Sequence, residues 1–497
     1  MNRRDFVKAL GVAGCSTLAP SFSLHAFAEQ RPSFNEAFNQ QLQQHPILRG
    51  WEGLTQDIAP RHFSWEGKLP EELRGKSLYR NGPARVVLGG ERYTHWFDGD
   101  GFVHRYAFDA KGVTHSGKFV RTKKFVEETK ANRFLYNGAG SIVPNSKLSK
   151  NAEAVNTANI ALLPVNNELW ALWEAAMPYK LNPNSLVTEG QVSLESALDG
   201  MPFSAHPHAD STGNLWNFGD LSFFGHAKLM IYQLTPQGKL SRYAMVDAPK
   251  SYVHDFAVTD NYLVFYFPPI QKGRGETLIS SMNWQGHQPG ELLVVDKNTL
   301  TPVLRVPFDA GFVFHFGNAW QEGNTLTVNA CWYHNADIML NDVKMVSDGA
   351  IGKHDRSTAA QIRINLSKKT AYLDNSTTPM EFVQFDNRFT GKATQLQFGV
   401  HASKHVTHGE YNSIASVNTQ TGHIDSYSFG NNVITEEPLF VPVSSKPGEG
   451  YLVNTGLDFV SGNTYCYVFN AQHIADGPVA QVKLDSYMPL GFHGAII

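Results

Sequence analysis

The chain ends in Gly491-Phe492-His493-Gly494-Ala495-Ile496-Ile497. Most C-termini are polar and frayed, but here small and apolar residues stand on both sides of His493. We therefore expect this tail to fold back into the interior and to close the fold. A histidine delivered in this way would meet partners from far upstream in the chain.

Three upstream histidines stand within or beside apolar, strand-like runs. They are His206 in Phe203-Ser204-Ala205-His206-Pro207, His254 in Tyr252-Val253-His254-Asp255-Phe256-Ala257 and His315 in Phe312-Val313-Phe314-His315-Phe316-Gly317-Asn318-Ala319. Neutral imidazole is the commonest protein ligand for iron, copper and zinc, and ligands from four separated strands would converge on the axis of a radially closed sheet. Their separations match no local metal motif, so it is their surroundings that single them out among 20 histidines.

Short apolar runs divided by turn signals recur along most of the chain. Three pairs of runs read as hairpins, at residues 228–234 and 239 onward, 291–295 and 300–306, and 413–417 and 423–429. Many short antiparallel strands predict an all-β fold, either a propeller or a large sandwich. Residues 33–51 form the exception, because their pattern indicates a short amphipathic helix after a serine cap.

Composition indicates one folded, soluble or peripheral protein. Charged residues are 18% and aromatic residues 12% of the 497, which argues against disorder. The formal net charge of −3 argues against nucleic acid as a partner, because a phosphate binder would show a basic surplus. No linker divides residues 29–497, which we expect to be a single domain with residues 29–75 as a helical cap segment.

The N-terminus has the features of a twin-arginine signal peptide over residues 1–28. The pair Arg3-Arg4 precedes a weakly apolar stretch, which ends at the small-x-small site Ala26-Phe27-Ala28. This predicts export to the periplasm. Lipidation at Cys15 is the alternative, although the apolar segment before it is very short.

The chain beyond this leader predicts neither a membrane span nor a thiolate metal site. No later apolar run approaches the roughly 20 residues needed to span a bilayer, and peripheral membrane contact remains open. Only Cys331 and Cys466 follow the leader, which excludes a thiolate-rich site. Whether the two cysteines pair is left open by the sequence.

Six separated segments, in order from about Leu78 to the C-terminus, give the chain its resemblance to a known family. It resembles the carotenoid cleavage oxygenases, which include lignostilbene dioxygenases and the retinoid isomerase of the eye. The segments are Leu78-Tyr79-Arg80-Asn81-Gly82-Pro83, His95-Trp96-Phe97-Asp98-Gly99-Asp100-Gly101, Ala205-His206-Pro207, His254-Asp255-Phe256-Ala257-Val258-Thr259, Phe314-His315 with Asn318-Ala319, and Gly491-Phe492-His493-Gly494.

The resemblance implies a seven-bladed β-propeller with a cap of helices and loops over an iron-bearing face. Four histidines would bind Fe(II) on its axis, namely His206, His254, His315 and His493. Three glutamates would support them, with Glu174 paired to His254, Glu381 to His315 and Glu437 to His493. A carboxylate that accepts the far ring N–H fixes the tautomer and makes the other nitrogen a better donor to the metal.

The implied activity is cleavage of a C=C bond of a carotenoid or apocarotenoid by O2, giving two carbonyl products. Stilbene-cleaving members carry a lysine before the first supporting glutamate, where this chain has Trp173, and several bacterial relatives have threonine where it has Ile160. The first difference favours an apolar polyene. The alternatives are a stilbene or phenylpropanoid cleaver, an isomerase that needs no O2, and an exported propeller that binds a ligand without catalysis.

Two other motifs have less support as metal sites. His401, His405 and His408 could share one helix face, but the residues before them read as strand and turn. The segment Asp98-Gly99-Asp100-Gly101 looks like part of a calcium loop, yet it lacks the later carboxylates of a complete one. We therefore interpret it, like Arg80-Asn81-Gly82-Pro83, as structural.

Overall fold

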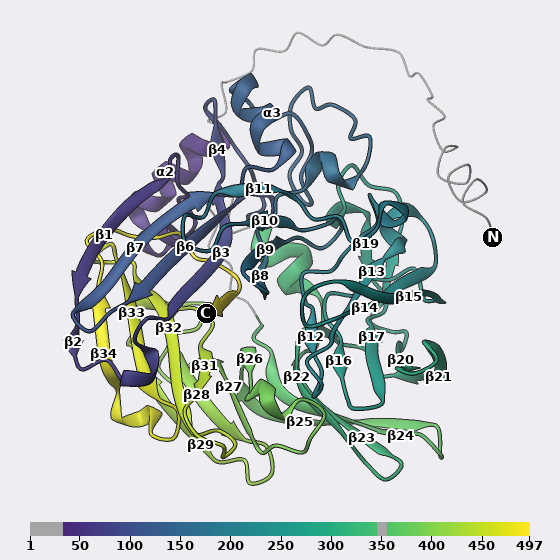
Figure 1. Cartoon of the computed structure of the whole chain (residues 1–497). Coiled ribbons are helices and arrows are strands. Elements are labelled where there is room, and N and C mark those ends of the chain that lie inside the picture. Colours follow the sequence, from purple (N-terminus) through teal and green to yellow (C-terminus); the bar gives the residue numbers. More distant parts are fainter. Residues whose placement is uncertain (1–32, 345–354) are drawn as a thin grey trace.

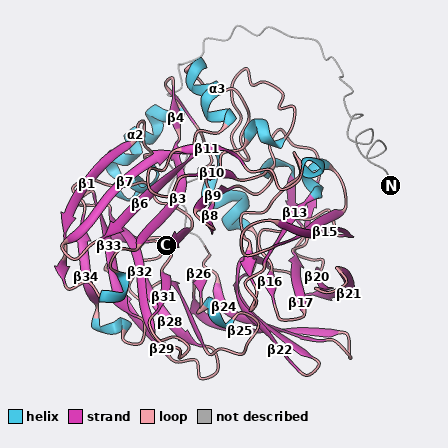
Figure 2. Cartoon of the chain, in the orientation of Figure 1, coloured by secondary structure: helices cyan, strands magenta, loops and turns pink. Residues whose placement is uncertain are grey.

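The computed structural model describes residues 33–344 and 355–497 of the chain. Within these residues, seven β-sheets stand around a common axis like the blades of a propeller (Figures 1 and 2). The all-β, seven-bladed prediction is confirmed. The signal peptide predicted at residues 1–28 lies outside the described residues, so export to the periplasm stays a prediction.

Chain order runs around the ring, and each blade is an antiparallel sheet. Blade 1 contains β1 (Ile58–Ser64), β7 (Gly112–Phe119), β6 (Asp100–Phe108), β3 (Ser77–Arg85) and β35 (Gly494–Ile496). Blade 2 contains β11 (Thr188–Gln191), β10 (Tyr179–Leu181), β9 (Glu168–Leu172) and β8 (Ala161–Val165). Blade 3 contains β12 (His208–Ala209), β13 (Leu215–Asp220), β14 (Lys228–Leu234) and β15 (Leu240–Asp247).

The second half of the ring continues in the same way. Blade 4 contains β16 (Ala257–Val258), β17 (Tyr262–Phe267), β20 (Gly290–Asp296) and β21 (Thr301–Phe308). Blade 5 contains β22 (Phe312–Glu322), β23 (Thr325–Tyr333), β24 (Thr358–Asn365) and β25 (Thr370–Pro379). Blade 6 contains β26 (Glu381–Gln384), β27 (Leu396–His401), β28 (Ser413–Asn418) and β29 (Ile424–Ser428).

Blade 7 combines one early strand with strands from the C-terminal part of the chain. It contains β2 (Glu66–Gly67), β34 (Pro478–Lys483), β33 (Asn463–Asn470) and β32 (Gly450–Asp458), and β32 also pairs with β30 (Val433–Thr435) and β31 (Leu439–Pro442). Two small hairpins lie outside the blades, β4 (Val87–Leu88) with β5 (Glu91–Arg92), and β18 (Ile270–Lys272) with β19 (Met282–Trp284). The three hairpins predicted from the sequence correspond to the pairs β14 and β15, β20 and β21, and β28 and β29.

The hydrophobic core lies between neighbouring blades. One cluster joins Phe218 and Ile231 of blade 3 to Phe265 and Leu293 of blade 4. Inner strands such as β22 are buried along most of their length, whereas outer strands such as β25 are largely exposed. Sheet faces packed on both sides require near-continuous apolar runs, as β22 shows.

The C-terminal tail closes the ring, as the sequence predicted. Strand β35 pairs with β3 of blade 1, while the early strand β2 pairs with β34 of blade 7. The main chain of Asn81 accepts a hydrogen bond from the N–H of Phe492 (2.8 Å) and donates one to the carbonyl of His493 (2.9 Å). A Cβ on Gly82 would lie 2.5 Å from the Cα of Gly491, so this close approach requires glycine.

Helices and loops cover one face of the propeller. The predicted N-terminal helix is α2 (Phe34–Gln44), capped by Ser33, and it leads into η1 (Pro46–Trp51). Two further cap elements are α3 (Lys123–Ala131) and the short η8 (Ile338–Asp342). Among the described residues, no helix is both long and apolar enough to cross a bilayer. Cys331 in β23 and Cys466 in β33 are buried in different blades and are not bonded to each other.

Candidate metal centre

The four predicted histidines meet at the axis, each carried by an inner strand or by the residues just before one. His206 precedes β12, His254 precedes β16, His315 lies within β22 and His493 precedes β35. Ring centroids are 4.4 Å apart for His206 and His254, 4.8 Å for His206 and His493, and 4.7 Å for His315 and His493. The tail histidine therefore joins the other three at one point.

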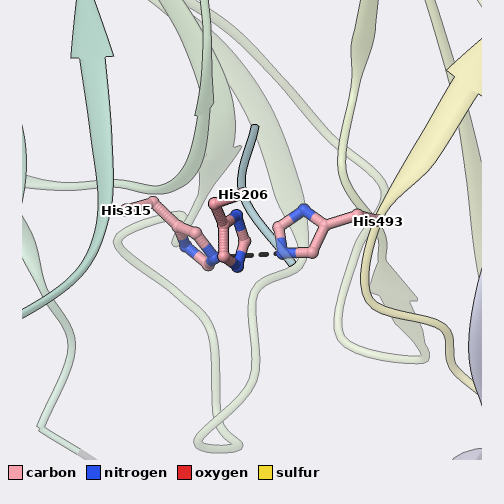
Figure 3. Close-up of side chains that lie close together, drawn as sticks. All are labelled: His206, His315 and His493. Carbon is pink, nitrogen blue, oxygen red and sulfur yellow. Dashed lines mark hydrogen bonds between the residues drawn. The ribbon is translucent and has the colours of Figure 1, made fainter. Parts of the chain in front are cut away.

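Three of the four rings already bring ligand atoms close together. One nitrogen each from His206, His315 and His493 lie within 4.8 Å of one another (Figure 3), and this is the only such group of three or more possible ligands in the described residues. His254 packs beside the group, with its ring centroid 5.5 Å from that of His315. The group within 4.8 Å does not include His254.

A glutamate supports three of the four imidazoles. Glu381 Oε2 lies 2.5 Å from Nδ1 of His315, and Glu437 Oε1 lies 2.9 Å from Nδ1 of His493. Glu174 makes the equivalent contact with Nδ1 of His254. When Nδ1–H donates to a carboxylate, the Nε2 lone pair of each ring is left for another partner.

His206 differs, because no carboxylate supports it. Its Nε2 is buried and has no hydrogen-bond partner in the part of the chain that the structure describes. Burial, and then the neighbouring His254 and His493, hold the pKa of His206 well below its ordinary value. Its ring is therefore neutral near pH 7, and a metal ion would supply the partner that its buried Nε2 lacks.

The contact between His315 and His493 also indicates a place for a metal ion. Their Nε2 atoms are 3.1 Å apart, the dashed contact in Figure 3, although both rings face carboxylates through Nδ1. Two lone pairs this close need a cation between them, either a proton on one ring or a metal ion bound by both. Nitrogen ligands at about 2.1 Å from one metal and at right angles to each other would be about 3 Å apart.

Local charge favours a cation at this position. Burial works to lower the pKa of His315, but Glu381 outweighs it and raises that pKa above its ordinary value. For His493 burial prevails over Glu437, and its pKa is lowered. The raised pKa of His315 reflects a negative potential, and the same potential would attract a metal ion.

Two of the three supporting carboxylates lack a basic partner. Glu437 pairs with the buried Arg80 at 3.1 Å. Glu174 and Glu381 have no ion pair with lysine or arginine among the described residues. Buried charges are costly unless compensated, and a cation at the histidines would offset the charges of Glu174 and Glu381. The residues present therefore fit a metal cation.

The backbone is irregular next to two of the site residues, His315 and Glu381. The pairing of β22 with β23 shifts register on both sides of Phe316, next to His315. Phe382, which follows Glu381, has a φ of 48°, a left-handed conformation that is unfavourable for a residue with a Cβ. Bulges and local strain of this kind commonly orient functional side chains.

A cavity of about 840 Å³ extends from the histidines through the cap. Its wall includes His254, His315 and His493, together with loops of the cap. Much of the remaining wall is aromatic, with Trp96, Phe97, Trp173, Phe314, Phe382 and Phe492 among its residues. Ile160 also lines it, so the cavity wall contains both the residue that replaces the lysine of stilbene-cleaving members, Trp173, and the residue that replaces the threonine of several bacterial relatives.

Several supporting residues were not identified from the sequence. Arg80, interpreted there only as structural, holds both the side chain and the main-chain carbonyl of Glu437, the latter at 2.7 Å. Gln384 donates to the same carboxylate at 2.9 Å, and the Tyr252 hydroxyl donates to Glu174 at 2.6 Å. Their partners lie between 53 and 357 residues away, so no local pattern could reveal them.

The two other candidate metal motifs, around His401 and Asp98, have structural contacts instead. His401 ends β27, and its Nδ1 lies 2.7 Å from the carbonyl of Pro379; no helix carries it and His408 together. Asp98 accepts hydrogen bonds from the backbone N–H groups of Ala139, Gly140 and Ser141. Asp98 therefore fixes a loop of the cavity wall.

Fold and site together define a β-propeller protein with a centre of four histidines on its axis. The chain belongs to the retinal pigment epithelial membrane protein family, whose model matches residues 54–496. This confirms the resemblance seen in the sequence, because that family contains the carotenoid oxygenases.

Individual relatives support this assignment. The apocarotenoid-15,15'-oxygenase of Synechocystis is 27% identical over 90% of this chain and 95% of its own length. The isoeugenol monooxygenase of Pseudomonas nitroreducens is 24% identical over 86% of this chain and 93% of its own length. A crystal structure of an ACO/RPE65 chimera, ACO being the Synechocystis apocarotenoid oxygenase, has a TM-score of 0.83 at 26% identity and covers 91% of this chain and 98% of its own. A cobalt-substituted Synechocystis ACO has a TM-score of 0.81 at 25% identity, with the same coverage.

Proposed function

We propose that this protein is a non-haem Fe(II) dioxygenase that uses O2 to cleave a C=C bond of a carotenoid or apocarotenoid into two carbonyl products. The observation that carries the proposal is the cluster of four imidazoles, with two uncompensated carboxylates, at the inner end of an aromatic cavity. The name of the Synechocystis relative, an apocarotenoid oxygenase, supports the substrate class.

In this proposal His206, His254, His315 and His493 hold the ferrous ion. Four neutral ligands preserve its double charge, and iron bound there supplies the redox chemistry with O2 that zinc lacks. Glu174, Glu381 and Glu437 keep the proton on Nδ1 of their histidines. They thereby leave each Nε2 free to bind the metal.

The cavity wall would bind and orient the substrate. Flat aromatic rings such as Trp173, Phe314 and Phe382 offer apolar surface to a conjugated chain and exclude water from the reacting bond. Trp173 offers no ammonium group for a phenolate oxygen, which disfavours a stilbene. Ile160 adds to the apolar surface near the histidines.

Aerobic turnover with paired substrates tests the proposal. After anaerobic loading with Fe(II), we expect an apocarotenal to be split into two carbonyl products, seen by mass spectrometry, with consumption of O2. A hydroxystilbene should be converted about 5- to 150-fold more slowly, since one lost polar anchor is worth about 1–3 kcal/mol. Preference for the stilbene would instead favour a phenylpropanoid cleaver. Isomerisation without O2 uptake would indicate an isomerase, and failure to bind iron would indicate a non-catalytic binding protein.

We also propose that the cap contacts a membrane surface from which an apolar substrate is taken. Leu148 is 96% exposed and directly precedes Ser149 and Lys150 of the cavity wall, and Ile142 on the same loop is 59% exposed. The variant Leu148→Asp should reduce co-sedimentation with phosphatidylcholine vesicles. Tyr372→Asp, at a 60% exposed site on β25, serves as the control. Equal binding by the wild type and both variants, or no binding by any, would contradict the proposal.

A further inference from the structure

Asp255, the residue after His254, has a buried carboxylate that faces three donors. It is 3% exposed. Its Oδ1 accepts a hydrogen bond from the backbone N–H of Phe256 at 2.7 Å and lies 2.7 Å from Nε2 of His208. Its Oδ2 accepts a hydrogen bond from the backbone N–H of Phe316 at 2.7 Å. No lysine or arginine pairs with it among the described residues.

These contacts connect three of the four histidine-bearing segments. His208 begins β12, two residues after His206. Phe316 follows His315 in β22, at the point where the register of that strand shifts. Asp255 itself follows His254. The three segments belong to blades 3, 4 and 5, and the innermost strands of separate blades share no sheet.

We infer that Asp255 is a positioning residue that sets the mutual spacing of His206, His254 and His315 at the metal centre. The inference rests on the proposed function, because it takes these histidines as metal ligands. The fourth histidine is held independently, since the N–H of Gly494 donates to Glu437 at 2.8 Å. One carboxylate thus aligns three ligands, while blade closure and Glu437 align the last.

The chemistry of the contacts explains why a carboxylate is needed. An ionised carboxylate only accepts hydrogen bonds, and here both oxygens face donors. The NH2 group of an asparagine at this position would face at least one of these donors. It would face either the N–H of Phe316 or the two donors on the other side, the N–H of Phe256 and Nε2 of His208. The side chain would keep its size, but one buried donor would lose its hydrogen bond. The segment that carries this donor would then no longer be held by residue 255.

The test compares Asp255→Asn with a matched variant, Asp425→Asn, each loaded with Co(II) as the probe metal. Asp425 also bridges backbone N–H groups, those of Ile474 and Ala475 at 2.7 and 3.0 Å, but on the outer strand of blade 6. Metal affinity is measured by competition with a chelator, and ligand geometry by the visible absorption of bound Co(II). Thermal unfolding of the metal-free proteins reports stability separately.

We expect Asp255→Asn to weaken Co(II) binding by about 10- to 100-fold and to alter the Co(II) spectrum. Asp425→Asn should lower thermal stability while leaving both affinity and spectrum unchanged. If Asp255→Asn does not fold, His208→Leu, which removes the one side-chain hydrogen bond between His208 and Asp255, should change the spectrum in the same direction. An unchanged affinity and spectrum in the Asp255 or His208 variant would overturn the inference and leave the proposed function standing. A wild-type chain that binds neither Co(II) nor Fe(II) would overturn both.

Discussion

Replacing His254 with alanine is expected to abolish both iron binding and formation of carbonyl products. The change removes one of the four proposed nitrogen ligands and also leaves Glu174 without the imidazole that it contacts. Losing an outer partner of a metal ligand typically costs about 10- to 100-fold in affinity or activity, and loss of the ligand itself should cost more. Iron content after anaerobic reconstitution and product yield by mass spectrometry measure the two effects.

A matched control comes from a histidine outside the cluster. His401→Ala removes an imidazole that contacts only the carbonyl of Pro379 at 2.7 Å in the described hydrogen bonds, so this variant should keep its iron and most of its activity. Full iron occupancy in His254→Ala would count heavily against the assignment of the metal centre. Equal loss in both variants would point to a general defect in folding.

Replacing Arg80 with methionine should destabilise the protein by about 3–5 kcal/mol, because it leaves Glu437 as a buried charge without its partner. Both side chains are 2% exposed, so solvent does not screen their interaction. Burial alone would raise the pKa of Glu437, while His493 and Arg80 hold it below its ordinary value. Without Arg80, Glu437 would hold a proton more readily and support His493 less well, so metal affinity should fall as well.

Urea unfolding of the metal-free protein measures the loss of stability. Lys228→Met serves as the control, because Lys228 and Asp247 form an exposed pair and such pairs contribute about 0–1 kcal/mol. The double variant Arg80→Met with Glu437→Gln should recover part of the lost stability, since no unpaired charge remains. A change below about 1 kcal/mol for Arg80→Met would contradict the role assigned to this pair.

Features that depend on neighbouring residues could be predicted from the sequence. The helix after Ser33 and the three hairpins follow from local patterns of apolar residues and turn signals, and the structure confirms them. The apolar surroundings of His493 correctly indicated a buried tail. The number of blades and the pairing of each glutamate with its histidine came only from resemblance to a family.

Features that depend on distant partners could not be predicted. No local pattern distinguishes Asp255 from the motif around it, because its contacts with His208 and Phe316 span 47 and 61 residues. Arg80 meets Glu437 across 357 residues. The left-handed conformation of Phe382 has no signal in the sequence either, since glycine would be expected there. In each case tertiary contacts decide the role of the residue.

Closure of the ring by β35 also sets the order of events during biosynthesis. His493 lies beside β35, which follows every other strand of the described residues in chain order, whereas β3, with which it pairs, is among the earliest. A ribosome-bound intermediate that has made six blades can hold at most three of the imidazoles. The four imidazoles can therefore meet only after translation has passed residue 493, so this group of histidines is among the last features of the fold to form.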